Sequence, residues 1–462
     1  MRGLDDLLLL ADSYKVSHWL QYPPGTERVY SYFESRGGEY SETVFFGLQY
    51  VLRERLTGAV VTRDRIDEAE RLLAAHLGDA RIFNRGGWQH ILDRHGGRLP
   101  VSIRAVPEGT VVPSSNVLMT VENTDPSCFW LTSYLETLLV QTWYPATVAT
   151  QSREMKRILL RYLEDTGDPS LVAFKLHDFG FRGVSSVESA ALGGAAHLVN
   201  FAGTDTLPAL AVAREIYGEE MAGFSIPAAE HSTMTAWGRE GEAAAMRNVL
   251  HRFPTGTVAC VSDSYDVFRA CAEVWGGELR GEVLARDGTL VVRPDSGDPP
   301  SVVVRVLETL GERLGAQRND KGYRVLDPHV RVIQGDGVDR ESLHAVLEAM
   351  KRAGWSADNV AFGCGGGLLQ RLHRDTCGFA FKCSSIVVDG IERDVWKDPA
   401  TDPGKRSKAG RLALVRRGET LVTVRADAAA GSADELVEVF RDGEIRRAWT
   451  FAEVRERAAQ GL

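Results

Sequence analysis

Short apolar runs alternate with polar or glycine-rich residues along the second half of the chain. The alternation covers 257–266 ("TVACVSDSYD"), 289–299 ("TLVVRPDSGDP"), 330–339 ("VRVIQGDGVD") and 359–370 ("NVAFGCGGGLLQ"). Amphipathic helical patterns over 301–315 and 340–354 separate the last three of these segments. A buried strand, a polar loop and a helix, repeated in this order, are typical of parallel β/α architecture. We therefore expect an α/β domain that binds its ligand at the carboxyl ends of the strands.

A second pattern is rich in short strands and turns. Segment 100–121 indicates strands broken by Pro, Gly and Ser, and 411–427 alternates like antiparallel strands. In 432–451 two strand patterns flank an Asp-Gly turn, whereas 61–75 has helical periodicity. We expect the tail to pack with the early strands as a second, β-rich domain.

The most apolar longer stretch, 131–150, contains Glu136, Gln141 and Pro145. Charge and proline inside such a stretch favour a buried helix and its exit over a membrane span.

The expected strand ends carry residues that suit a phosphorylated ligand. They are Ser262, Asp263, Asp266, Arg293, Asp295, Gly335, Asp336, Gly337 and Gly365–Gly367. Glycines that enter a helix expose backbone N–H groups to phosphate, and an arginine holds phosphate in a two-pronged fork. A carboxylate there can bind ribose hydroxyls or a Mg²⁺ shell. Each loop alone is compatible with an ordinary turn, but four at one sheet edge predict a phosphosugar or nucleotide site.

Two further stretches have both structural and functional interpretations. In "KLHDFGFRGVSS" (175–186), Phe179 is either a buried ring or a stacking face for a flat ligand, and Arg182 is either a surface charge or a phosphate ligand. In "NFAGTDT" (200–206), Asp205 is by default a helix N-cap; as a site residue it would accept hydrogen bonds from a ligand amide.

"PAAEHSTMTAWG" (227–238) sets His231 directly after Glu230, among small side chains. The imidazole could be a core residue, a metal ligand, a proton shuttle or a covalent phosphate carrier. Basic residues cluster in the tail, and they form either a surface loop or part of an anion site: Arg374, Lys382, Lys405, Arg406 and Lys408.

Bulk composition restricts the class of protein. A chain of 462 residues suggests two or three structural units, and a net charge of −9 argues against general binding of nucleic acid or anionic membranes. The 6 cysteines show neither CxxC pairs nor zinc spacing, so we interpret them as reduced thiols of a cytoplasmic protein. The N-terminus has acidic residues around a short leucine run, which is not typical of a signal peptide.

The chain resembles the nicotinamide phosphoribosyltransferase family, in order and over nearly its whole length. The resemblance rests on the stretches quoted above together with "ADSYKVSHWLQYPPGTERVYSYFESR", "FFGLQY", "AVPEGTVVP", "VENTDP", "WYPATVATQSRE" and "KDPATDPGKRSKAGR". The resemblance implies a dimer built on the irregular α/β barrel of type II phosphoribosyltransferases plus a β-rich domain. It places the barrel in residues 1–35 plus 130–368 and the accessory domain in 36–129 plus 369–462. It also implies that nicotinamide and phosphoribosyl pyrophosphate give nicotinamide mononucleotide and pyrophosphate in NAD salvage. Mg²⁺ would be required, and ATP hydrolysis would be coupled through a phosphohistidine.

The same resemblance assigns residue roles. Phe179 and Tyr14, the latter from the other subunit, would sandwich the nicotinamide ring, with Asp205 on the carboxamide and Arg182 beside it. Phosphoribosyl and phosphate groups would contact Arg293, Gly335, Asp336, Gly365, Gly366, Arg374, Lys382, Lys405 and Ser262. His231 matches the phosphorylated histidine, and the other catalytic candidates are Asp295 and Glu230. Candidate Mg²⁺ ligands are Asp266, Asp295 and Asp336.

Two rival functions stay open at this point. A nicotinate phosphoribosyltransferase would run the same chemistry on an acid, and a non-catalytic metabolite-binding protein could use the same fold. Asp205 distinguishes nicotinamide from nicotinate as the substrate, because a carboxylate attracts a carboxamide N–H and repels a carboxylate. Cys364 stands in the glycine-rich loop where we would expect Ser, and it could add sensitivity to oxidation.

Overall fold

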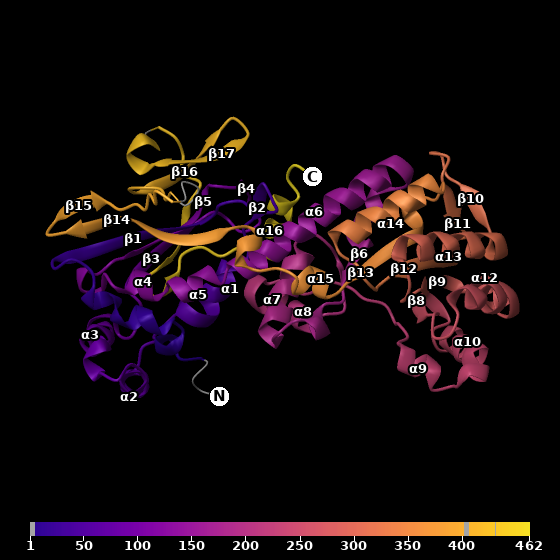
Figure 1. The fold of residues 1–462 in the computed structure, drawn as a ribbon, viewed down its shortest axis with the longest axis horizontal. Coiled ribbons are helices and arrows are strands. Elements are labelled where there is room, and N and C mark those ends of the chain that lie inside the picture. The colour runs from indigo at the N-terminus through magenta and orange to yellow at the C-terminus, as the bar shows by residue number, and fades with distance from the viewer. Residues whose placement is uncertain (1–4, 402–405, 430) are drawn as a thin grey trace. The chain divides into compact units, whose positions relative to one another are not determined.

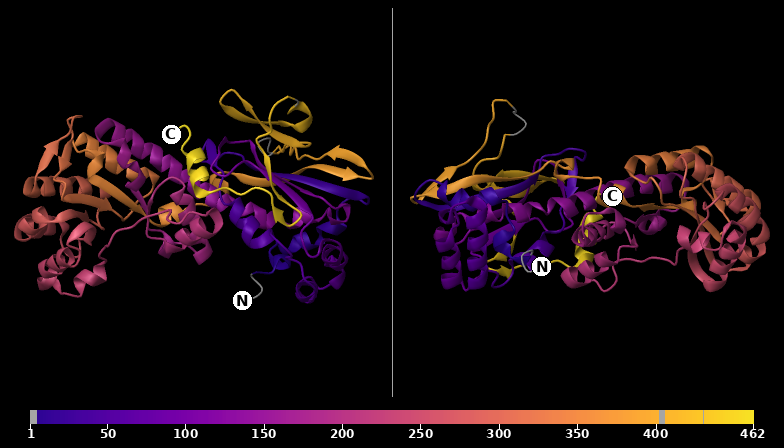
Figure 2. Two further views of the ribbon diagram at one scale, coloured as in Figure 1. Left: turned by 180° about the vertical axis from the view of Figure 1, so that it is seen from behind. Right: turned by 60° about the horizontal axis from the view of Figure 1, so that its bottom comes forward.

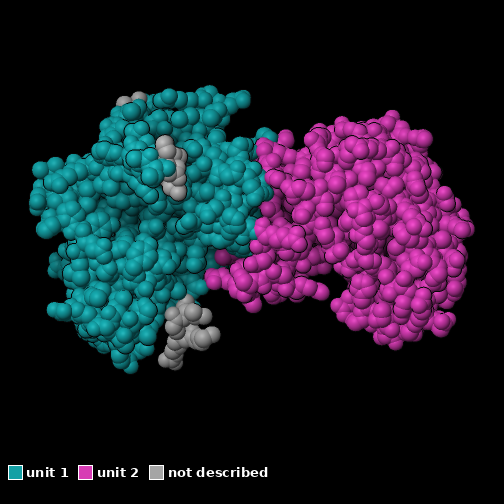
Figure 3. Space-filling model, in the orientation of Figure 1, with its two compact units in different colours: residues 1–150, 215–219, 372–461 teal, residues 151–214, 220–371, 462 magenta. Residues whose placement is uncertain are grey.

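The computed structural model describes residues 5–401, 406–429 and 431–462. The chain divides into two compact units (Figure 3). Unit 1 comprises residues 1–150, 215–219 and 372–461, and unit 2 comprises residues 151–214, 220–371 and 462. Each unit contains its own main sheet. The expected combination of an α/β domain with a separate β-rich domain is confirmed.

Unit 1 is organised around a 7-stranded antiparallel sheet (Figure 1). Its strands, in spatial order, are β15 (Ile391–Asp394), β14 (Phe379–Val388), β1 (Thr26–Ser35), β5 (Val117–Asn123), β3 (Val101–Ala105), β18 (Val437–Arg441) and β19 (Glu444–Ile445). Two small pairs accompany it: β2 (Glu42–Val44) with β4 (Val111–Pro113), and β16 (Leu412–Arg417) with β17 (Thr420–Arg425). The strands expected in 100–121, 411–427 and 432–451 are therefore present.

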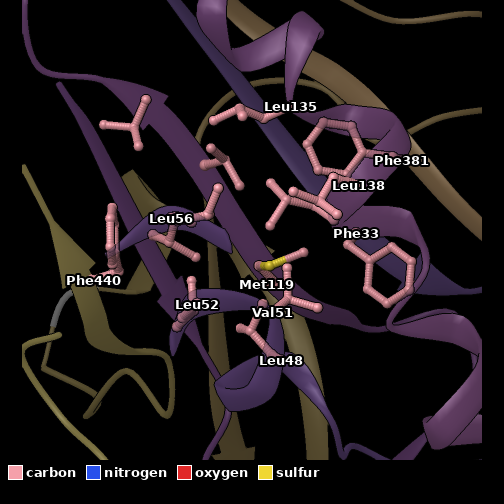
Figure 4. Packing of buried hydrophobic residues seen from close by; sticks show 14 of the residues in the cluster. Phe33, Leu48, Val51, Leu52, Leu56, Met119, Leu135, Leu138, Phe381 and Phe440 are labelled. Carbon is pink, nitrogen blue, oxygen red and sulfur yellow. The ribbon is translucent and has the colours of Figure 1, made fainter. Parts of the chain in front are cut away.

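Both faces of the central strand β1 are covered, which explains why almost every residue of β1 is buried instead of every second one. Helices lie on one side of the sheet and the β16–β17 hairpin on the other (Figure 1 and Figure 2). The helices of this unit are α1 (Leu48–Val51), α2 (Arg63–Leu77), α3 (Arg85–His95), α4 (Leu131–Tyr134), α5 (Glu136–Val140) and α16 (Phe451–Ala458). Phe33, Met119 and Phe381 from the sheet pack against Leu135 and Leu138 (Figure 4).

The division of the chain differs from the expected one chiefly at residues 1–35 and 130–150, which lie in unit 1. Residues 215–219 also lie in unit 1, and 369–371 lie in unit 2. β1 pairs with both β14 and β5, so it cannot be separated from this sheet. Stretch 131–150 also differs from the single helix expected: it forms α4, α5 and the start of α6 (Trp143–Thr166). Trp130, Leu131 and Tyr134 are buried in the core of unit 1, so the apolar character of this stretch reflects burial.

Unit 2 contains a 6-stranded sheet in which every neighbouring pair is parallel. Its strands, in spatial order, are β7 (Gly203–Thr204), β6 (Leu176–Asp178), β13 (Val360–Cys364), β12 (Val330–Gln334), β9 (Asp287–Arg293) and β8 (Thr255–Val261). A separate hairpin joins β10 (Ala316–Arg318) and β11 (Arg324–Leu326). The four strands expected between 257 and 370 are all members of the main sheet.

One extended segment, 224–229, contacts both edges of this sheet. Phe224 exchanges hydrogen bonds with the β7 edge: its N–H donates to Ala202 and its carbonyl accepts from Thr204. A few residues later, Ala259 of β8 donates to Pro227 and accepts from Ala229. Because the segment bridges the first and last strands, it closes the sheet into an irregular barrel. The next residues of the chain are Glu230 and His231.

The helices that follow the strands begin at side-chain caps. Asp298 accepts from the N–H of Ser301 at the start of α13 (Pro299–Leu314), and Asp339 accepts from Ser342 in α14 (Arg340–Arg352). The other helices are α7 (Val187–Leu198), α8 (Leu207–Tyr217), α9 (His231–Thr235), α10 (Glu242–Arg252), α11 (Val267–Arg269), α12 (Arg280–Ala285) and α15 (Gly366–Leu369). Within the described ranges, no helix combines the length and apolar composition needed to cross a bilayer.

Candidate active site

A pocket of about 870 Å³ lies at the carboxyl ends of the unit 2 strands. Residues that follow β6, β7, β9, β12 and β13 meet there with the start of α9. The lining residues are Phe179, Phe181, Arg182, Gly183, Asp205, Thr206, Glu230, His231, Ser232, Val261, Arg293, Asp295, Gly335, Gly365 and Gly366. Most of the residues predicted from the sequence are thus brought together within one unit.

Phe179 provides the aromatic face of the pocket. Its backbone N–H donates to the carbonyl of Cys364 at 3.0 Å, which extends the pairing of β6 with β13 by one residue. Its ring lies on the bare backbone of Gly363, where an added Cβ would stand 2.0 Å from Cε2 of the ring. The Arg293 guanidinium lies 5.7 Å from the ring centroid. Glycine at 363 is therefore what allows the ring to lie flat at this strand end.

Asp205 places a carboxylate on the same side of the sheet. Its N–H donates to the carbonyl of Asp178 at 2.9 Å, and the hydroxyl of Ser225 donates to its carboxylate. Its side chain is exposed and lines the pocket.

Beneath it, Asp178 is fully buried, and this burial raises the pKa of its carboxyl to about 6. Its Oδ1 accepts from the N–H of Gly180 at 2.7 Å.

Arg293 and Asp295 form an ion pair at the end of β9. Nε of Arg293 donates to Oδ1 of Asp295 at 2.9 Å, and Nη2 lies 2.8 Å from the same oxygen. A Cβ at Gly335 would stand 3.0 Å from Nε of Arg293, so the glycine leaves room for the guanidinium. Both side chains are partly exposed and can still contact a ligand.

The glycine-rich loop opens toward the pocket at Gly366, where an added Cβ would meet no protein atom within 4 Å. Gly365 and Gly366 precede and begin α15, so their backbone faces the place where a phosphate is expected. Cys364 points away from it: its Sγ donates to the carbonyl of Val338 at 2.9 Å. Burial raises the pKa of this thiol to about 12, which disfavours the reactive thiolate form.

His231 is the first residue of α9, and its partner is Asp263. Nε2 of the imidazole lies 3.0 Å from Oδ1 of Asp263, whose Oδ2 accepts from the hydroxyl of Ser296 at 2.6 Å. Since a carboxylate only accepts, Nε2 carries the proton, and in the neutral ring Nδ1 keeps its lone pair. Glu230 accepts from the hydroxyl of Ser232, so the carboxylate that orients the ring is Asp263.

The pocket lining does not include six of the predicted strand-end residues: Ser262, Asp263, Asp266, Asp336, Gly337 and Gly367. Ser262 is fully buried: its hydroxyl donates to the carbonyl of Cys260 and accepts from the indole N–H of Trp275. Asp266 caps α11 by accepting from the N–H groups of Phe268 and Arg269. Asp336 is exposed on the loop after β12, and its carbonyl accepts from the side chain of Gln334.

The remaining predicted residues lie outside unit 2. Tyr14 is 59% exposed in the 3₁₀ helix Ser13–Leu20, and Arg374 and Lys382 also belong to unit 1. Burial lowers the pKa of Lys382, whose ammonium donates to the carbonyl of Phe381. Lys405 lies outside the described residues.

The sequence analysis included Asp263 only among the strand-end residues that suit a phosphorylated ligand, without a partner, and it assigned no role to Ser296 or Gly363. Asp263 stands in a predicted strand-end loop, and that position was the only local sign of its function. The contact between Gly363 and Phe179 joins segments far apart in the sequence, so no local pattern reveals it.

The donor set of the pocket fits Mg²⁺ that arrives with a phosphate ligand. Mg²⁺ prefers oxygen ligands and is usually held by one or two carboxylates plus substrate phosphates. Asp295 and Glu230 present carboxylates to the pocket. Asp266 fits less well, because its carboxylate oxygen Oδ1 is engaged by two backbone N–H groups.

Comparison with known families gives two matches along the chain. The profile described as "Nicotinate phosphoribosyltransferase (NAPRTase) family" matches residues 174–444, and that described as "Nicotinamide phosphoribosyltransferase, N-terminal domain" matches residues 6–103. The chain is 56% identical to the nicotinamide phosphoribosyltransferase of Xanthomonas campestris pv. campestris, with 99% of both chains covered. It is 33% identical to the enzyme of the same name from Acinetobacter baylyi, with 98% of this chain and 96% of that one covered.

Two solved structures share the fold at low sequence identity. Nicotinate-nucleotide pyrophosphorylase from Pyrococcus furiosus has a TM-score of 0.56 and 16% identity, covering 98% of this chain and 95% of its own. Human nicotinic acid phosphoribosyltransferase has a TM-score of 0.55 and 18% identity, covering 97% and 93%. These matches support the assignment of the barrel and the β-rich domain.

Proposed function

The chain belongs to the nicotinamide phosphoribosyltransferase family, and from this premise we propose that its pocket transfers the phosphoribosyl group of phosphoribosyl pyrophosphate to nicotinamide. The products are nicotinamide mononucleotide and pyrophosphate, as in NAD salvage. The observation that carries the proposal is the meeting of the Phe179 ring, the Asp205 carboxylate and the Gly365–Gly366 backbone around one cavity. These groups match a flat amide-bearing ring at one end of the ligand and a phosphate at the other.

Recognition of the base depends on Phe179 and Asp205. The pyridine ring stacks on Phe179, while Asp205 accepts a hydrogen bond from the carboxamide N–H. Nicotinate would bring a second carboxylate to Asp205, and the repulsion disfavours it. Arg182 is exposed and lines the pocket, which allows it to lie beside the base and near the nucleotide phosphate.

The sugar and its phosphates contact the strand ends. Gly365 and Gly366 hold the 5′-phosphate through backbone N–H groups. Arg293, Asp295 and Gly335 surround the ribose. Asp295, which lines the pocket, would hold Mg²⁺ there, and the ion would supply positive charge to the leaving pyrophosphate.

The reaction itself needs no general base. The lone pair of the pyridine nitrogen attacks the anomeric carbon, the bond from that carbon to pyrophosphate breaks, and the ring nitrogen becomes the pyridinium of the product. The chain contributes by positioning: Phe179 and Asp205 fix the ring, and the glycine loop fixes the sugar phosphate.

His231 couples ATP hydrolysis to this transfer. Nδ1 of its ring attacks the γ-phosphorus, an N–P bond forms, and the bond to the departing ADP breaks. Asp263 accepts from Nε2 at 3.0 Å and so stabilises the positive charge that develops on the ring. Water later hydrolyses the phosphoimidazole to phosphate and restores His231.

The active enzyme is a cytoplasmic homodimer. Tyr14 is exposed on its own chain and is available to stack on the nicotinamide held by the partner. Arg374 and Lys382, with Lys405, likewise reach the site of the partner chain, where they bind phosphate. The family resemblance supports this arrangement.

Product analysis tests the proposed reaction. Purified protein is incubated with phosphoribosyl pyrophosphate and either nicotinamide or nicotinate, with and without ATP. We expect nicotinamide mononucleotide and an equal amount of pyrophosphate, with a much lower rate on nicotinate. Faster turnover of nicotinate would contradict the assignment of the base, and absence of pyrophosphate release with both bases would exclude catalysis.

Replacing His231 by alanine tests the coupling. His231→Ala should abolish ADP release from ATP and leave slow, ATP-independent synthesis, because only the nucleophile is removed. His251→Ala is a matched control: that imidazole contacts a carboxylate of Glu282 at 2.9 Å but does not line the pocket. Normal ATP hydrolysis by His231→Ala would refute the role of His231.

A further inference from the structure

Two imidazoles converge on one carboxylate oxygen in unit 1, in a cluster that the proposed reaction does not use. Nε2 of His90 lies 2.8 Å and Nε2 of His95 lies 2.7 Å from Oδ2 of Asp125. Both histidines belong to α3, and Asp125 precedes the short 3₁₀ turn Pro126–Cys128. The three potential ligand atoms lie within 4.8 Å of one another.

This arrangement matches the chemistry of a transition-metal site. Neutral imidazole nitrogen and carboxylate oxygen are common ligands of Zn²⁺ and similar divalent ions. Zinc–ligand bonds of about 2.0–2.1 Å in a tetrahedron place ligand atoms roughly 3.3 Å apart. The two His–Asp contacts are shorter than that by about half an ångström, so each imidazole nitrogen would move away from Oδ2 by that amount when an ion replaces the shared proton.

Asp125 and helix α3, which carries both histidines, are held in place by neighbouring residues. Oδ1 of Asp125 accepts from the N–H of Ser127 at 2.8 Å, which leaves Oδ2 turned toward the imidazoles. The backbone carbonyl of Asp125 accepts from the side chain of Asn123, a residue of β5, at 2.8 Å. Trp88 and Ile91 anchor α3 in the core. Such second contacts orient metal ligands and reduce the entropy lost on binding.

Solvent reaches the cluster. The side chains of His90, His95 and Asp125 are 31%, 27% and 19% exposed. An ion can therefore enter without unfolding of α3, and water can complete its coordination.

We propose that His90, His95 and Asp125 bind one divalent transition-metal ion of the zinc class, with water as the fourth ligand. The ion links the C-terminal end of α3 to the turn that follows β5. It is distinct in chemistry from Mg²⁺, because two of the three protein ligands are nitrogen atoms.

Zinc binding to the untagged, full-length protein tests the site. After treatment with a chelator and dialysis, the protein is titrated with Zn²⁺ against a chromophoric chelator, and the experiment is repeated with His90→Gln and His95→Gln. His76→Gln is the control, because His76 is an exposed histidine in the last turn of the neighbouring helix α2. Circular dichroism checks that each variant is folded.

We expect one equivalent of zinc to bind to the wild-type protein and to His76→Gln, with affinity at least tenfold lower in the other two variants. Co²⁺ in place of Zn²⁺ should give the visible bands of four-coordinate cobalt without thiolate charge-transfer absorption. Equal zinc affinity in wild type and both test variants would overturn the proposal. The three residues would then only hydrogen-bond α3 to the turn after β5. Thiolate absorption would overturn it as well, by assigning the ion to cysteine.

Discussion

Gly363 is the residue that allows Phe179 to serve as a binding surface. Its lack of a side chain leaves space for the ring, and neither residue can change independently of the other. This dependence gives a sharp test of the base site.

Gly363→Ala should displace the Phe179 ring, because the new methyl group would stand 2.0 Å from Cε2. We expect KM for nicotinamide to rise on the order of tenfold to a hundredfold, as for other small displacements of positioning groups. Steady-state kinetics measures the effect. Gly281→Ala, where a methyl group meets no atom within 4 Å, should leave KM unchanged. Unchanged kinetics in Gly363→Ala would show that the ring does not position the base.

Asp205 determines which base is preferred. Asp205→Asn should lower kcat/KM for nicotinamide by roughly tenfold to a hundredfold, the value of one hydrogen bond to a charged group. The rate on nicotinate should rise, since the repulsion is removed. Competition between the two bases measures the ratio, and Asp320→Asn at an exposed turn is the control. An unchanged ratio would remove Asp205 from the carboxamide site.

Strand β6 ends on a carboxyl group that folding places in an unfavourable setting. Asp178 is fully buried, and its pKa of about 6 lies above the ordinary value of 3.8. A raised carboxyl pKa favours folding while the group is protonated, below pH 3.8, and this contribution is lost as the pH rises through about 6. The strand end that carries Phe179 is therefore less stable at neutral pH than its hydrogen bonds alone suggest.

Asp178→Asn removes this titration while it keeps an acceptor for Gly180. The unfolding free energy of the variant minus that of wild type should be about 1–2 kcal/mol larger at pH 8 than at pH 5. Urea unfolding at both pH values measures the difference, and Asp320→Asn provides an exposed aspartate for comparison. An equal difference at the two pH values would mean that Asp178 titrates normally.

Other elements also link local sequence to the site. Segment 224–229 forms backbone hydrogen bonds with both edges of the barrel sheet, and this places His231, which follows it, at the pocket. Its residues show neither helical nor strand periodicity, so the sequence indicated the histidine but not the closure that positions it.

The proposed dimer has a consequence for the whole molecule. If Tyr14 and Phe179 of one active site come from different chains, Tyr14→Ala and Phe179→Ala complement each other when mixed. Random reassembly makes half of the dimers hybrid, each with one intact site, so activity should recover to about a quarter of the wild-type value. Activity after joint refolding or co-expression measures this.

The matched control mixes Asp205→Asn with Phe179→Ala. Both changes lie in unit 2, so every site keeps one defect and no recovery is expected. Recovery no greater in the first mixture than in this control would place Tyr14 and Phe179 of each site in one chain.

The sequence by itself predicted the order of strands and helices between 257 and 370, and it placed Arg293, Asp295, Gly365 and Gly366 at one edge of a sheet. These features depend on local periodicity and on the rule that parallel strands present their carboxyl ends together. The roles of Phe179 and Asp205 came from the family resemblance, because the local pattern left both a structural and a functional interpretation open.

Only the tertiary structure decided which of two adjacent residues points to the active site and which points into the core. Ser262 and Asp263 are adjacent, but successive side chains of an extended backbone point to opposite faces, so Ser262 enters the core and Asp263 reaches His231. It also placed Gly363 under Phe179 and joined β1 to β14, because contacts between distant segments depend on strand register, which no short stretch of sequence contains.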